Sequence, residues 1–115
     1  MDSILTSVKK DLGITADYTH FDDDIIMDIN VAFSTLMQLG VGPATGFSIS
    51  DASAAWTDFI PDSPTLNLVK KYVAAKARVL FDPPQSSSLL EAYNNTISEM
   101  EWRINVSVDP ANTFE

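Results

Sequence analysis

Two consecutive prolines, Pro83 and Pro84, constrain the fold of this chain more than any other local feature. Proline lacks a backbone N–H and its ring clashes with the preceding helical turn, and the residue before a proline is pushed out of the helical region. A helix that includes Phe81 must therefore stop at Asp82. The serines at 86–88 then offer N-cap hydroxyls for a new helix. The stretch predicts a rigid corner between two helices.

Apolar residues on both sides of this corner, and in the first half of the chain, recur at the spacing of amphipathic helices. Capping and stopping residues bound these patterns: Asp22 and Ser63 precede two of them, Pro64 suits a first helical position, and Gly13 and Gly40 end two others. The predicted main helices cover residues 3–12, 23–39, 64–81 and 87–105, and a short helix is expected near 51–58.

The last predicted helix carries capping-box spacing at its start, since Glu91 follows Ser88 by three residues. The region 40–64 is the least regular part of the chain and holds three of its four glycines. We therefore expect an all-α fold, a small bundle of about four main helices. The predicted helical domain covers residues 1–106 and includes the long irregular loop 40–64, and a flexible C-terminal tail covers 107–115.

Composition narrows the possible functions. The length of 115 residues predicts one domain. The absence of cysteine excludes disulfides, thiolate metal sites and cysteine nucleophiles. Its first residues carry charges and lack the apolar core of a signal peptide, and no apolar run approaches the ~20 residues that span a bilayer. We expect a soluble protein that is intracellular when made.

Charge is unevenly distributed. Sixteen acidic residues against seven basic ones give a formal net charge of −9, which disfavours nonspecific binding to nucleic acid or to an anionic membrane. Four of the basic residues, Lys70, Lys71, Lys76 and Arg78, fall on one predicted helix, and the aspartates at 22–24 with Asp28 fall on another. Separate acidic and basic faces can pair with copies of the chain or with a charged partner. Two solvated helix faces are the simpler alternative.

Candidate residues for catalysis or metal binding are few. His20 is the only histidine and lies in a linker beside Tyr18 and Phe21, so packing or surface exposure explains it better than catalysis. The aspartate run 22–24 lacks the alternating ligands, glycine and terminal glutamate of an EF-hand, and helix capping explains it. No phosphate-binding or nucleophile-elbow motif is present. The sequence predicts no enzyme, no metal site and no cofactor.

The segment SEMEWRI, residues 98–104, combines a charge pair with an aromatic side chain. Glu99 and Arg103 are four residues apart in the favourable order for an ion pair on one helix face. Trp102 points away from the main apolar stripe of its helix, so it either covers a second core cluster or contacts a partner. We also hypothesise that Arg103 reaches Asp82 in the proline corner.

These residues carry a resemblance to a known family. The Phe-Asp-Pro-Pro run at 81–84, followed by a polar cap and a helix that ends in Glu-Trp-Arg at 101–103, resembles the head–tail connector proteins of long-tailed bacteriophages, the gene-product-six-like family. The opening helix, the Asp-capped second helix and the glycine-rich loop are also similar. The resemblance covers roughly residues 3–106 and is most specific in the second half.

The resemblance implies a structural virion protein of the phage neck, assembled in the host cytoplasm. Such proteins form a ring of about a dozen subunits beneath the portal protein, with interfaces that close by rotation. The ring extends the DNA channel without sequence-specific DNA binding, has no membrane contact, and gives the stopper or tail-completion protein a docking surface.

Specific residues follow as candidates for these contacts. We expect the basic residues Lys70, Lys71, Lys76 and Arg78 to meet an acidic surface of the neighbouring subunit that includes Asp23, Asp24 and Asp28, with Trp102 as a further interface residue. The candidates for contact with portal or stopper are the loop 41–60, with Trp56, Phe59 and Ile60, and the segment 105–115. The alternatives are a small helical adaptor domain of a non-viral protein and, less consistent with the net charge, a nucleic-acid-binding protein.

Overall fold

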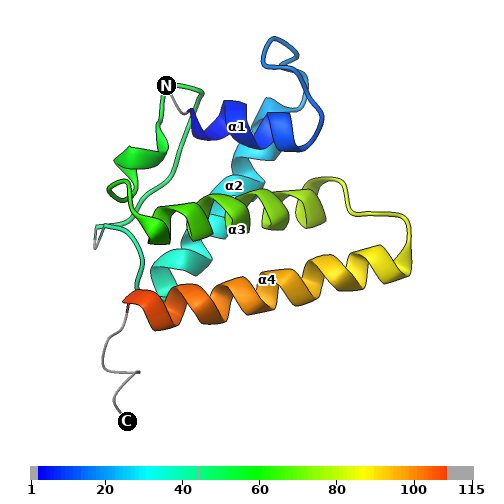
Figure 1. Cartoon of the computed structure of the whole chain (residues 1–115). Helices are drawn as coiled ribbons and strands as arrows, with labels where there is room; N and C mark the ends of the chain where they lie inside the picture. The colour runs from blue at the N-terminus through cyan, green and yellow to red at the C-terminus, as the bar shows by residue number, and fades with distance from the viewer. Residues whose placement is uncertain (1–2, 44, 109–115) are drawn as a thin grey trace.

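A computed structural model describes residues 3–43 and 45–108, and it is helical throughout its regular parts (Figure 1). The helices are α1 (Ile4–Asp11), α2 (Asp22–Gln38), the 3-10 helix η1 (Trp56–Asp58), α3 (Pro64–Phe81) and α4 (Ser87–Val108). The predicted all-α fold with four main helices is thus confirmed. α4 runs three residues further than expected, and the rest of the predicted C-terminal tail, 109–115, lies outside the described residues.

The helix starts show which local signals determine the boundaries. α3 begins as predicted, because Ser63 Oγ accepts the N–H of Leu66 at 3.2 Å and proline follows the cap. The predicted capping box of α4 is wrong: Ser86 Oγ accepts the N–H of Leu89 at 3.3 Å, so Ser88 already lies inside the helix. The short helix near 51–58 is reduced to η1, since Asp51 instead closes a side-chain turn.

Asp22 corrects the prediction for the start of α2. It does not cap the helix but lies in its first turn, and its Oδ1 is 2.7 Å from Nζ of Lys9 on α1. Lys9 is only 1% exposed and donates a second bond to the carbonyl of Ala16 at 3.1 Å. This buried ion pair therefore ties α1, the linker and α2 together.

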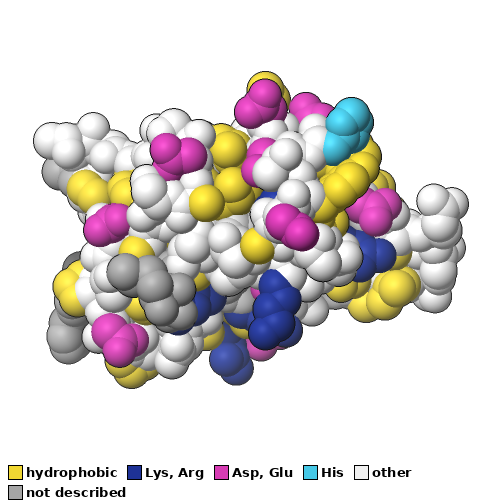
Figure 2. Space-filling view, turned by 90° about the horizontal axis from the view of Figure 1, so that it is seen from above, with side chains coloured by type: hydrophobic (Ala, Val, Ile, Leu, Met, Phe, Trp, Pro, Cys, Tyr) yellow, Lys and Arg dark blue, Asp and Glu magenta, His cyan; other side chains and the backbone are white. Residues whose placement is uncertain are grey.

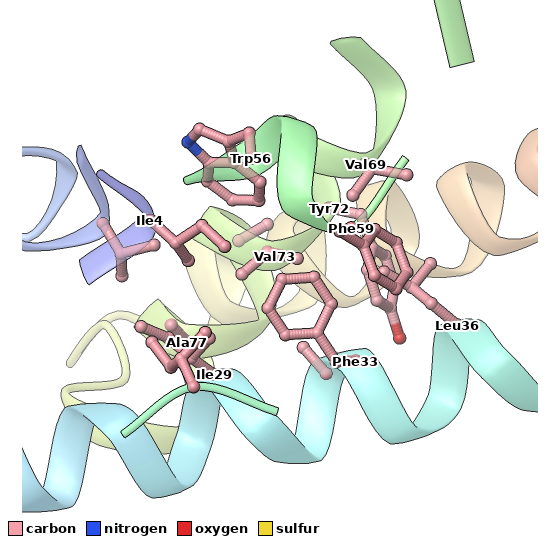
Figure 3. Close-up of a cluster of buried hydrophobic side chains, with 14 of the residues drawn as sticks. Ile4, Ile29, Phe33, Leu36, Trp56, Phe59, Val69, Tyr72, Val73 and Ala77 are labelled. Atoms are coloured by element: carbon pink, nitrogen blue, oxygen red, sulfur yellow. The ribbon is translucent and has the colours of Figure 1, made fainter. Parts of the chain in front are cut away.

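The core lies where α1, α2 and α3 meet, and it takes in the start of the long loop and η1 (Figure 3). Phe33 of α2 is at its centre, with its ring centroid 4.6 Å from that of Phe59 and 5.0 Å from that of Phe47. Fully buried side chains at helical spacing include Ile4, Val8, Ile25, Ile29, Ala32, Leu36, Val69, Tyr72, Val73, Ala77 and Ile104. The apolar stripes predicted from the sequence supply most of these positions.

α3 and α4 form an antiparallel hairpin, with α2 crossing behind α3 (Figure 1). Among the described side chains of α4, only Ile97 and Ile104 are buried. Two polar bonds add to this attachment: Tyr72 Oη donates to Glu101 Oε2 at 2.9 Å, and Asn105 Nδ2 donates to the carbonyl of Leu39 at 3.2 Å. α4 is consequently the most exposed of the long helices.

The proline corner joins α3 to α4 as predicted, but a different arginine stabilises it. Arg78 Nε donates to the carbonyl of Asp82 at 2.6 Å, and its guanidinium lies 5.8 Å from the ring centroid of Tyr93 on α4. Arg103 pairs with Glu99 at 3.3 Å, the predicted pair. The hypothesis that Arg103 reaches Asp82 is wrong, because 16 residues of α4, about 24 Å, separate it from the corner end of that helix.

Candidate subunit interface

A basic groove runs between α3 and α4, with the end of α1 at its edge. The residues that line it include Asp11, Asn67, Lys70, Lys71, Leu89 and Tyr93. Positions 67, 70, 71, 74 and 78 of α3 share one side of the helix because they are three or four residues apart. Leu89 is half exposed on the opposite rim. The groove therefore combines two ammonium groups with an apolar wall.

Arg78 and Lys76, both predicted as interface residues, differ from the other two. Arg78 lines the groove, but its side chain already bonds the Asp82 carbonyl and faces Tyr93, so its structural role is to hold the corner. Lys76 does not line the groove, since it follows Lys71 by five residues, about 140° around the helix. The structure thus brings Lys70 and Lys71 together and separates Lys76 from them.

An acidic and apolar hollow lies where the last turn of α3 meets the first half of α2. Its lining consists of Phe21, Asp24, Met27, Asp28, Leu80, Phe81 and Asp82. Met27 is 65% exposed and Leu80 is 43% exposed, which are large values for apolar side chains. Asp23, the third predicted acidic residue, lines an adjoining shallow hollow that also includes Met27 and Val31. We refer to the two hollows together as the acidic surface.

The environment of the Asp28 carboxyl group disfavours its negative charge. Partial burial, and then the negative charge of Asp24, raise the pKa of Asp28 above its ordinary value. Ionised Asp28 is therefore held in an unfavourable environment in the isolated subunit. A cation placed over this surface would relieve the repulsion.

The groove and the acidic surface are two separate surfaces of the subunit. The groove lies between α3 and α4, whereas the acidic surface lies where the end of α3 meets the first half of α2. Figure 2 agrees: the Lys and Arg side chains gather in the lower part of the view, whereas most Asp and Glu side chains lie above them. The charge segregation predicted from the sequence is therefore a property of the folded surface.

The aromatic candidates separate into core and surface residues. Trp56 and Phe59 are each 3% exposed, and Trp56 Nε1 donates to Ser7 Oγ at 2.9 Å, so both fix the loop to the core. They present no side-chain surface to a partner, and Ile60 is half buried beside them. Trp102 is 67% exposed, which excludes the alternative that it covers a second core cluster. The sequence analysis had not identified Met27 and Leu80 as interface candidates, because helical spacing alone does not show that an apolar side chain is exposed.

Within 3–43 and 45–108, no three His, Asp or Glu side chains are grouped so that they could hold a metal ion. No helix in that part of the chain has the length and apolarity to cross a membrane.

The fold and these surfaces define the class: a small all-α protein whose most distinctive exposed features are two surfaces of opposite charge. The chain matches the family model described as phage connector protein over residues 4–111, and it belongs to that family. The resemblance drawn from the proline corner and the Glu-Trp-Arg motif is thereby confirmed, and with it a structural role in a phage particle. No curated protein and no solved structure gave a significant match.

Proposed function

We propose that the chain is a head–tail connector subunit that forms a homo-oligomeric ring beneath the portal protein in the virion neck. The ring extends the channel through which DNA passes and offers the stopper or tail-completion protein its docking surface. Assembly takes place in the host cytoplasm. The observation that carries the proposal is the match to the phage connector family over nearly the whole described chain.

Two properties of the subunit support this function. Its two oppositely charged surfaces consist of different residues, so one subunit can contact two neighbours through different surfaces. Its net charge of −9 suits a channel component, because a predominantly acidic protein does not hold phosphate groups and lets DNA slide past. The loop 41–60 and the segment 105–115 stay candidates for contact with portal or stopper.

Electron microscopy of the purified chain with the portal ring of the same phage tests the proposal. We expect a closed second ring stacked on one end of the portal, and a complex mass that exceeds the portal mass by a whole number of subunits. The chain alone at the same concentration is the control for self-assembly. If a large excess of chain leaves the portal ring bare and forms no ring by itself, the proposed function is wrong.

A further inference from the structure

We propose that the basic groove of one subunit binds the acidic surface of the next, with Lys71 placed over Asp24 and Asp28. This inference rests on the proposed function and specifies the contact that would build the ring. The occupant of each surface is a second copy of this chain, as charge complementarity, apolar complementarity and the separation of the two surfaces indicate.

Charge complementarity is the first argument. Lys71 is exposed and supplies the main cationic contact of the groove, beside the partly buried Lys70 and the carboxylate of Asp11. On the acidic surface, Asp24 and Asp28 are one turn apart on α2, and their mutual repulsion favours an incoming cation. The ammonium group of Lys71 placed over these carboxylates would offset part of the negative charge of the acidic surface.

Apolar complementarity is the second argument. Met27, Leu80 and Val31 are exposed around the carboxylates, and Leu89 is exposed on the rim of the groove. These apolar side chains are unfavourably exposed to water in the isolated subunit. They can pack against one another when the two surfaces meet. Exclusion of water then strengthens the neighbouring charge pairs, because the local dielectric constant falls. The contact is therefore more than a set of exposed ion pairs, which would contribute little.

The separation of the surfaces is the third argument. Because the groove and the acidic surface consist of different residues, a single pair of subunits joined by this contact leaves one groove and one acidic surface unfilled. Each further copy fills one and adds one, and the series closes into a ring when the rotation between neighbours brings the first and last subunits together. The contact is therefore head-to-tail, the type from which a ring is built.

Charge reversal tests the contact in the full-length chain. Lys71→Glu and Asp24→Lys each place like charges across every interface, and the combined variant restores opposite charges at every interface. Assembly is measured as the concentration that gives half-maximal ring formation, or half-maximal loading of the portal ring where free subunits do not close. Lys10→Glu and Asp62→Lys make the same charge changes at exposed positions that line neither surface. Circular dichroism verifies that each variant is folded.

We expect each single reversal to raise the half-maximal concentration by about tenfold or more, the controls to change it little, and the combined variant to recover most of the loss. The contact is wrong if the single reversals assemble like their controls, or if both lose assembly and the combined variant regains none. Either result leaves the proposed ring intact, provided that the wild-type chain forms rings. A wild-type chain that neither closes nor loads the portal overturns both proposals.

Discussion

Replacing Tyr72 by phenylalanine removes a hydroxyl whose hydrogen bond to Glu101 helps to hold α4 against the rest of the subunit. Tyr72 is fully buried on α3, and its hydroxyl donates to Glu101 Oε2 at 2.9 Å. Phenylalanine keeps the ring and so leaves almost no cavity. The loss is a hydrogen bond to a carboxylate, worth about 1.5–3 kcal/mol when buried. Glu101 is partly exposed and can bind water instead, so we expect the free energy of unfolding to fall by about 1–2 kcal/mol.

Thermal and urea unfolding followed by circular dichroism measure this loss. For a domain of this size, 1 kcal/mol corresponds to about 4 °C in Tm, so Tyr72→Phe should lower Tm by at least about 4 °C. Burial, and then the hydrogen bond and charge of Glu101, raise the pKa of Tyr72 above its ordinary value of 10.0. Because the folded-state pKa is the higher one, the neutral phenol contributes its full stability below pH 10 and loses it only above that value.

A double-mutant cycle with Glu101→Ala assigns the effect to the pair. If the bond is responsible, the Tyr72→Phe change should cost much less in the Glu101→Ala background, with a coupling energy of about 1 kcal/mol. A Tyr72→Phe variant that unfolds within about 0.3 kcal/mol of the wild type would refute the reasoning, because α4 would then be held by its apolar contacts alone.

Three further predictions concern other parts of the subunit. Lys9→Met should lower the free energy of unfolding by about 1–3 kcal/mol in urea titrations, since it leaves a partly buried carboxylate on α2 without its cation; an unchanged midpoint would contradict this. Gly42→Ala should destabilise clearly more than Gly46→Ala in thermal unfolding, because both glycines have positive φ but only at Gly42 would a Cβ overlap the Phe59 ring; equal losses would argue against that overlap. Asp28→Asn should raise Tm at pH 7, since a raised pKa means that the ionised form weakens the fold, and the gain over wild type should vanish below about pH 3.8; a gain that persists in acid would show another cause.

The helices were predictable because their boundaries depend on local chemistry. Ser63 and Pro64 define the start of α3 and the two prolines define its end, whatever the rest of the chain does. The limits of α1 and α2 likewise follow glycines and apolar spacing to within a residue or so. Local signals misplaced the caps of α2 and α4, where several candidate side chains stand side by side and tertiary contacts select among them.

Contacts between distant segments were not predictable. Nothing in the sequence pairs Lys9 with Asp22 rather than with another of the clustered aspartates, because the pairing depends on how the linker folds back. Trp56 and Phe59 lie in an irregular loop, where no periodicity separates a core residue from an exposed one. Arg78, rather than Arg103, stabilises the corner because α4 runs away from it.

The candidate interface was predictable in its charges but not in its shape. The two charge clusters could be found by counting along helices, and Lys70, Lys71, Asp24 and Asp28 do lie on surface hollows. Which basic residues share a side depends on how α3 packs against both neighbours, and this separates Lys76 from the others. The apolar part of the acidic surface arises where two helix ends meet, which no single-helix pattern reveals.

α4 is attached to the rest of the subunit mainly through its second half, so its two halves differ in local stability. Ile97, Glu101, Ile104 and Asn105 all lie in its second half, and the half that follows the corner, Ser87–Thr96, has no buried side chain. Hydrogen exchange should therefore be faster in the first half than in the second. Leu89, in that first half, forms one wall of the basic groove. A neighbouring subunit bound in the groove would therefore restrict the motion of this half of α4, which is otherwise attached to the core only from Ile97 onward.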